Sequence, residues 1–169
     1  LDHGTPSIGF ALAERMHVNV WATRLEERGL PRGRWLTALK RAVADGLPDD
    51  HSISVDGAGP QPLGALRDLV TVTPGQRLAY LTDLADTPGN RDRAVALARD
   101  ADVLFIEAPF LAEDAEVARD RCHLTTRAAG EIARAAGVRR VQPFHISPRY
   151  EDEAPSLAEV ACFSGLPTG

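Results

Sequence analysis

The chain has 169 residues, of which 44% are hydrophobic and 25% charged, and its formal net charge is −5 at pH 7. These shares are typical of a globular domain, and the acidic balance argues against a uniformly basic nucleic-acid-binding protein. The two cysteines lie far apart, so neither a disulfide framework nor a CxxC zinc knuckle is indicated, and a reducing cytoplasm is the simplest location. No apolar run reaches membrane-spanning length, and no signal-peptide pattern is visible.

The first part of the chain contains one short strand and a long polar excursion. Residues 7–13 alternate enough to predict a strand. Segment 22–45 predicts two short helices interrupted by glycine and proline. The Pro/Gly/Asp-rich passage 45–64 predicts a loop with a brief strand at 52–55. We therefore expect residues 18–75 to be an excursion from the core.

Regular alternation of strands and helices begins at residue 76. The run 76–83 is nearly continuous in apolar residues, which is typical of a strand in a sheet covered on both faces. Further strands are expected at 102–108 and 138–144. Alternating strands and helices predict an α/β fold with a mostly parallel sheet and right-handed crossovers.

Four helices are expected between and after these strands. The first begins near Asn90, as its N-cap, and runs to about residue 100. The second lies near 112–120. The third, at about 126–136, has Thr125 as N-cap and Gly137 as the residue that ends it. The tail is expected to be weakly helical at 155–161 and loosely ended.

Five side chains able to bind metal or transfer protons stand at the ends of these elements. They are His3, Asp83, Glu107, His123 and His145. Ligands gather at the carboxyl ends of strands in open α/β sheets, and imidazole and carboxylate groups suit zinc or a similar ion. Taken singly, each also has a structural interpretation, because an aspartate after a strand often forms a turn and a loop histidine is often solvated. Glu107 is different, since an acid at the end of an apolar strand requires a partner.

Five segments carry a family resemblance in order and with compatible spacing. They are LDHGTPSIGF, GQRLAYLTD, ADVLFIEAPF, CHLTT and FHISPRY, within residues 1–153. Together they resemble the C-terminal half of ribonuclease Z, the tRNA 3′-end endonuclease branch of the metallo-β-lactamase fold superfamily. The resemblance implies half of an αβ/βα sandwich, built mostly of β-α-β units, with an inserted helical arm. It implies one partial domain over 1–169, with a core at 1–17 and 76–153 and a flexible arm at about 18–75.

The resemblance also implies which residues bind metal. His3 lies in the segment that resembles the family's third metal motif, and His145 lies in the segment that resembles its last. Asp83 corresponds to the bridging aspartate, with Asp86 as the alternative. Asp83 is preferred because it stands at the end of its strand. These residues would hold two zinc ions in a complete enzyme.

The remaining implied roles concern catalysis and substrate. Glu107 and His123 match the family's paired catalytic loops, in which His123, oriented by Glu107, would protonate the leaving 3′-oxygen. The segment GLPRGRW resembles the Gly-Pro motif of an arm that grips the tRNA elbow, although a solvated pair of basic helices is the alternative. Substrate contacts are expected from three basic residues of the arm, Arg32, Arg34 and Lys40. A further contact is expected from Arg149, which follows His145; its alternative role is to hold the tail in place.

The resemblance implies a zinc-dependent endoribonuclease that removes 3′ trailers from precursor tRNA, as a homodimer in the cytoplasm. A phosphodiesterase of the same fold that acts on a small molecule such as a cyclic nucleotide is the alternative, against which the basic arm argues. The family's first metal motif, a His-x-His-x-Asp-His run, is absent from this sequence, which starts at Leu1 without Met. We therefore expect a fragment that is catalytically incomplete on its own and exposes one face of its sheet.

Overall fold

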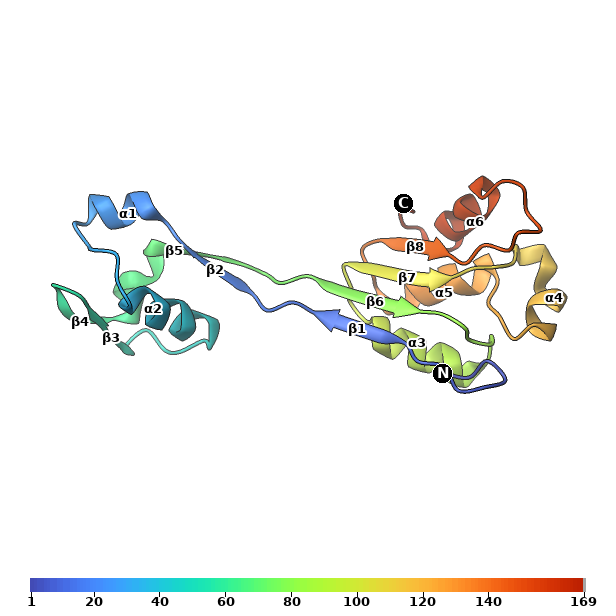
Figure 1. Cartoon of the computed structure of the whole chain (residues 1–169), viewed down its shortest axis with the longest axis horizontal. Helices are drawn as coiled ribbons and strands as arrows, with labels where there is room; N and C mark the ends of the chain where they lie inside the picture. Colours follow the sequence, from blue (N-terminus) through green and yellow to red (C-terminus); the bar gives the residue numbers. More distant parts are fainter. Residues whose placement is uncertain (169) are drawn as a thin grey trace. The chain divides into compact units, whose positions relative to one another are not determined.

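The computed structural model describes residues 1–168 and divides into two compact units. One unit contains residues 1–13 and the chain from Gln76 onward, and the other spans Glu14–Gly75 (Figure 1). Each unit has its own hydrophobic core. Within the described residues, no helix is both long enough and apolar enough to span a bilayer.

The first unit is built on a four-stranded sheet with the order β1-β6-β7-β8 (Figure 1). β6, β7 and β8 are parallel, and β1 pairs antiparallel with β6 at one edge. The carboxyl ends of the three parallel strands therefore meet at one edge of the sheet, and the predicted mostly parallel sheet is confirmed. The strands are β1 (Phe10–Ala13), β6 (Arg77–Leu81), β7 (Val103–Glu107) and β8 (Val141–Phe144).

Helices cover one face of this sheet. Alternate strand residues such as Leu81, Ile106 and Val141 are fully buried and join a single core with the apolar sides of α3, α5 and α6. Burial of this kind contributes about 25 cal/mol per Å² of apolar surface. The helices are α3 (Pro88–Ala98), η2 (Ala112–Asp114), α4 (Ala115–Asp120), α5 (Thr126–Ala136) and α6 (Ala154–Ser164).

The opposite face of the sheet is open. Phe10 and Leu12 on β1 are 55% and 67% exposed. Tyr80 on β6 stacks on Phe144 of β8, and both are only half-buried. The expectation that the strand at 76–83 is covered on both faces is therefore wrong: its burial alternates, because the described residues provide helices for one face only. The predicted exposed face is confirmed.

Of the two N-cap residues predicted from the sequence, Thr125 is confirmed and Asn90 is wrong. Thr125 caps α5, since its side chain accepts a hydrogen bond from the Ala128 N–H, and Gly137 ends that helix in the left-handed region, as expected. Asn90 does not cap α3. Thr87 does, because the helix begins at Pro88, whose missing N–H and fixed φ suit the first helical position.

The tail is more ordered than the sequence indicates. α6 extends over Ala154–Ser164 and packs closely on α5. The contact centres on Gly130, where an added Cβ would lie 2.6 Å from Cβ of Phe163. The prediction of a short, weak helix is wrong because the lack of a side chain at Gly130 lets the α6 backbone approach, and tertiary packing stabilises what local propensity does not. The final residue of the tail, Gly169, lies outside the described residues.

The second unit contains two helices and two small sheets. The two helices predicted within 22–45 and the strand at 52–55 are confirmed. The prediction of a loop holds for residues 45–51 and 56–58. It is wrong for residues 59–64, where β3 forms a hairpin with β4 and the fully buried Leu63 begins η1. β2 pairs with β5. The elements are β2 (His17–Val20), α1 (Ala22–Glu27), α2 (Trp35–Ala44), β3 (Ser52–Val55), β4 (Gly59–Pro62), η1 (Leu63–Leu69) and β5 (Val70–Thr73).

Candidate active site

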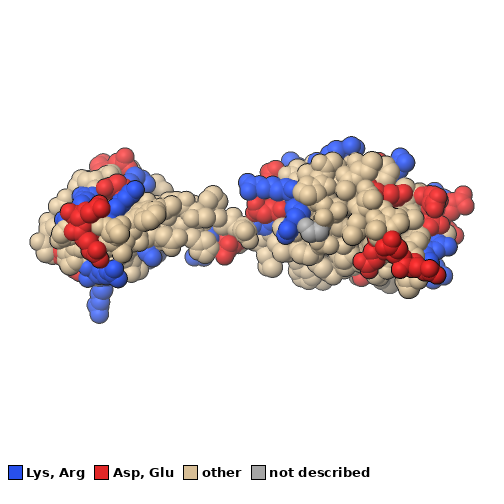
Figure 2. Space-filling model, turned by 90° about the horizontal axis from the view of Figure 1, so that it is seen from above, with Lys and Arg blue, Asp and Glu red and all other residues tan. Residues whose placement is uncertain are grey.

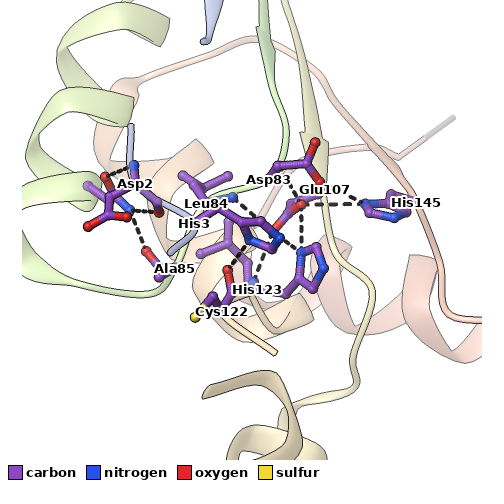
Figure 3. Close-up of polar contacts among 11 residues, drawn as sticks. Asp2, His3, Asp83, Leu84, Ala85, Glu107, Cys122, His123 and His145 are labelled. Atoms are coloured by element: carbon purple, nitrogen blue, oxygen red, sulfur yellow. Dashed lines mark hydrogen bonds and ion pairs between the residues drawn. The ribbon is translucent and has the colours of Figure 1, made fainter. Parts of the chain in front are cut away.

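Four of the five predicted site residues converge at the carboxyl edge of the parallel strands (Figure 3). Asp83 follows β6, Glu107 ends β7, His145 follows β8 and His123 lies between α4 and α5. Each offers one nitrogen or oxygen atom, and these atoms all lie within 4.8 Å of one another. The spacing is close enough for the group to share a cation.

Glu107 is the centre of this group. Its carboxylate is fully buried and accepts hydrogen bonds from the backbone N–H of Asp83 (2.7 Å), of Leu84 (3.5 Å) and of Leu124 (3.1 Å). Nδ1 of His123 lies 3.1 Å from both carboxylate oxygens. A buried carboxylate requires such donors, and here it ties the ends of two strands to the loop that carries His123. With its oxygens already satisfied, Glu107 is better suited to orient groups than to bind a metal.

The contact with Glu107 sets the tautomer of His123. A carboxylate only accepts hydrogen bonds, so Nδ1 of His123 carries the ring proton and donates a hydrogen bond to Glu107. Nε2 of His123 is then the atom available for proton transfer. The side chain is 16% exposed and lines a cleft of about 610 Å³, together with His3, His145 and Arg149.

His3 joins the group from the N-terminal segment. Its ring centroid is 4.3 Å from that of His123, and its Nδ1 lies 2.6 Å from the carbonyl oxygen of Cys122. The carbonyl only accepts, so Nδ1 of His3 is the donor and Nε2 keeps its lone pair. Metal-binding histidines commonly donate their second nitrogen to a backbone carbonyl in this way.

Three loop residues of the site have left-handed backbones. The φ angles are 52° at Asp83, 57° at Cys122 and 60° at His145. This conformation costs a residue other than glycine about 1–2 kcal/mol. Such strained residues are concentrated at functional sites, where the surrounding structure holds them. His145 directly follows the parallel strand β8, and Asp83 lies two residues after the end of β6.

The donor set fits a divalent cation of the zinc type. The side chains of Asp83 and His145 are each 46% exposed, with Oδ1 and Nδ1 3.9 Å apart. His3 adds an imidazole with a free Nε2, and carboxylate and imidazole are ligands that zinc binds readily. Asp86 lies outside the group, because Arg91 donates to its carboxylate and also contacts Glu131. The two bonds hold the guanidinium charged, and they raise the pKa of Arg91 above its ordinary value, the hydrogen bond to Asp86 most of all.

An asparagine that the sequence did not reveal as a site residue positions His3. Asn90 is 1% exposed, and its side-chain oxygen accepts from the Asp2 N–H (3.0 Å). Its side-chain nitrogen donates to the carbonyls of Asp2 (2.7 Å) and Ala85 (2.9 Å). The amide thus holds the residue before His3 against the loop between Asp83 and α3. Its place at the start of a helix resembles a cap in sequence, which conceals this role.

Replacing Asn90 by alanine is expected to lower the free energy of unfolding by about 1–2 kcal/mol, because the part-buried Asp2 N–H loses its partner and the Asp2 and Ala85 carbonyls each lose one of their two hydrogen bonds. The loss should also weaken zinc binding, since His3 is no longer held. Urea denaturation and zinc titration measure the two effects. Asp92→Ala, at an exposed position of the same helix, is the control and should change stability by less than about 0.5 kcal/mol. Equal stability of the two variants would contradict the positioning role.

Arg149 and Tyr150 fasten the loop after β8. Nη1 of Arg149 lies 3.4 Å from Oδ1 of Asp114, and the Tyr150 hydroxyl donates a hydrogen bond to the same carboxylate. The Leu111 N–H in turn donates to the Tyr150 oxygen (3.0 Å). Burial first, and then the hydrogen bond to Asp114, raise the pKa of the Tyr150 hydroxyl. Arg149 therefore has a structural partner and also lines the cleft.

The predicted substrate residues of the arm lie in the second unit. Arg32, Arg34 and Lys40 are all exposed, and Arg32 lies 3.8 Å from Glu26. Figure 2 shows acidic and basic side chains interspersed on the visible surface of both units. No uniform basic patch is visible on that face.

The α/β sheet with aspartate, glutamate and two histidines at its carboxyl edge defines a candidate metal-dependent hydrolase site. Residues 51–146 match the family described as "Beta-lactamase superfamily domain", and the chain belongs to that family. The expected fold class is thereby confirmed. The solved metallo-beta-lactamase fold protein YhfI from Bacillus subtilis is 19% identical, with a TM-score of 0.49 over 59% of this chain and 39% of its own.

Curated relatives of this chain are ribonuclease Z proteins. That of Thermobifida fusca is 43% identical over 98% of this chain and 48% of its own length. That of Geobacillus kaustophilus is 37% identical over 91% of this chain and 46% of its own length. The resemblance to the C-terminal half of ribonuclease Z is confirmed. The chain spans about half the length of the curated relatives it matches.

Proposed function

We propose that the chain is the C-terminal part of a zinc-dependent endoribonuclease that removes 3′ trailers from precursor tRNA in the cytoplasm. The observation that carries the proposal is the buried Glu107–His123 pair beside Asp83 and His145, in a chain that aligns over 98% of its length with a ribonuclease Z. The pair provides an oriented proton donor, and its neighbours provide cation ligands.

His123 is the general acid of the proposed reaction. Glu107 accepts from its Nδ1 and so leaves Nε2 to face the cleft, where Nε2 first takes up a proton, forming the imidazolium, and then delivers that proton to the leaving 3′-oxygen. His3, Asp83 and His145 would hold zinc. When bound, zinc supplies a water molecule activated at neutral pH and positive charge beside the phosphate. Arg149 lines the same cleft, and in this proposal its guanidinium would contact a phosphate of the RNA.

The second unit supplies RNA affinity in this proposal. Arg32, Arg34 and Lys40 are exposed and able to contact phosphates of the tRNA, which would make binding salt-dependent. Phosphate contacts of this kind fix position without reading sequence. We also propose that the complete enzyme is a homodimer; only the resemblance to ribonuclease Z supports this part of the proposal.

The chain by itself is proposed to be inactive. Among the described residues, one group of potential metal-binding side chains occurs, and Glu107 and His123 in it are engaged with each other. His3, Asp83 and His145 then remain as ligands, whereas two zinc ions of about four ligands each require more. The missing ligands must come from other residues of the complete enzyme.

A chimaera tests the proposed function. The matching half of the Thermobifida fusca ribonuclease Z is replaced by this chain, and cleavage of a 5′-labelled precursor tRNA is followed with zinc present. We expect cleavage at the start of the trailer, and His123→Ala should slow it by about 10²–10⁴-fold through loss of proton transfer. His51→Ala, at an exposed position in the second unit, is the matched control and should keep nearly full activity.

Three outcomes would each contradict one part of the proposal. A folded chimaera that does not cut precursor tRNA but hydrolyses a cyclic nucleotide would favour the small-molecule phosphodiesterase. Equal rates for the His123→Ala variant and the parent chimaera would remove His123 from the mechanism. Cleavage of the precursor by the 169-residue chain alone would disprove the proposed incompleteness.

A further inference from the structure

A second cavity shares His123 with the cleft. Its volume is about 520 Å³, within the range of small-molecule sites. The loop before α3, the helix α4 and the first turn of α5 form its walls. His123 borders both this cavity and the cleft, so the two spaces meet at the proposed proton donor.

One wall of this cavity is apolar and made of small side chains. Ala112, Ala115 and Ala118 come from η2 and α4, and Ala85 is contributed by the loop before α3. Alanine methyl groups present a shallow surface with no hydrogen-bonding group. A planar ring can lie against such a surface, whereas a small hydrated ion gains nothing from it.

The rest of the lining carries excess positive charge. Three arginines and one aspartate border the cavity: Arg91, Arg119, Arg127 and Asp86. Arg91 is neutralised by Asp86 and Glu131, as described above. In the described part of the chain, Arg119 and Arg127 form no ion pair. Arg127 stacks on Phe163 at 4.6 Å, which occupies the face of the guanidinium and leaves its N–H edge for a ligand.

We propose that this cavity is a subsite for one ribonucleotide of an RNA strand, with the base against the alanine wall and a phosphate at Arg119 and Arg127. Planar guanidinium groups bind phosphate oxygens through paired N–H donors, and the apolar wall favours a nucleoside over a bare anion. The place of His123 between the cavity and the cleft makes this nucleotide a close neighbour of the cleaved bond. In this form the inference rests on the proposed function.

Binding to the 169-residue chain tests the subsite. The measurement is isothermal titration calorimetry in the presence of a chelator, with inorganic phosphate, CMP and a 5′-phosphorylated cytidine trinucleotide as the probes. The expected order of affinity is trinucleotide, then CMP, then phosphate. Arg127→Gln and Arg119→Gln should each weaken trinucleotide binding by about tenfold or more. Arg134→Gln, at an exposed position of the same helix as Arg127, should leave it within about twofold.

A second variant keeps the test valid if an arginine variant unfolds. Ala115→Trp fills the cavity from an exposed position and should abolish trinucleotide binding while the circular dichroism spectrum is unchanged. Phosphate binding as tightly as CMP would overturn the nucleoside part of the proposal. CMP binding as tightly as the trinucleotide would overturn the assignment to an RNA strand in favour of a free mononucleotide. Binding that is unaffected by all three variants would place the RNA elsewhere.

The test separates the subsite from the proposed function. It is done without metal and without cleavage, so failure of the nuclease assignment does not change the binding results. An active chimaera whose cavity variants bind the trinucleotide normally would disprove the subsite alone.

Discussion

Replacing Glu107 by glutamine is expected to lower the free energy of unfolding by about 3 kcal/mol. A hydrogen bond to a charged acceptor contributes about 1.5–3 kcal/mol, and a buried donor left without an acceptor costs about 1–3 kcal/mol. The carboxylate accepts from the Asp83 N–H, the Leu124 N–H and Nδ1 of His123. The NH2 group that replaces one carboxylate oxygen can only donate hydrogen bonds. At least one of these groups then faces another donor, and the loops of Asp83 and His123 separate.

Two measurements check this expectation. Urea denaturation gives the stability, and the NMR signals of His123 report whether its Nδ1 proton is still held. Glu113→Gln, at an exposed position of η2, is the control and should cost less than about 0.5 kcal/mol. A Glu107→Gln variant as stable as the parent, with an unchanged His123 signal, would show that the carboxylate is not the organising group.

The open face of the sheet is expected to make the isolated chain self-associate. Phe10 and Leu12 are more than half exposed, beside the stacked rings of Tyr80 and Phe144. Apolar patches of several hundred Å² are uncommon on monomers and mark surfaces that bind another protein segment. Sedimentation velocity should show species larger than a monomer that grow with concentration.

Charged substitutions on this face test the cause of association. Phe10→Lys together with Leu12→Lys should shift the chain towards the monomer, because lysine at an edge strand opposes pairing and keeps the surface hydrated. Arg15→Lys, in the second unit, is the control and should leave association unchanged. A parent chain that sediments as a monomer at all concentrations and melts cooperatively would contradict this expectation.

Patterns that are local in sequence predicted most of the first unit. The strand at 102–108 and the cap of α5 by Thr125 depend on neighbouring residues, which a sequence displays directly. The parallel arrangement follows from strand–helix alternation and brings Asp83, Glu107 and His145 to one edge. The proximity of these three residues was therefore predictable before any distances were known.

The features that the sequence did not reveal depend on contacts between distant segments. The role of Asn90 requires Asp2, which lies 88 residues away. The extent of α6 depends on the close approach that Gly130 permits, and composition alone indicates a weak helix there. The apolar character of the strand at 76–83 suggested two covered faces, whereas the described residues cover one.

Zinc titration of the 169-residue chain most directly tests the central claim. The claim is that Asp83 and His145, which lie in one group of potential ligands, hold zinc together with His3, whose ring contacts His123. We predict one bound zinc ion per chain, with affinity reduced more than about tenfold, or 1.4 kcal/mol, by Asp83→Ala. Asp86→Ala should leave the affinity nearly unchanged, since Asp86 is engaged with Arg91. Absence of zinc binding, or binding indifferent to Asp83→Ala, would contradict the metal site, and two tightly bound ions would contradict its incompleteness.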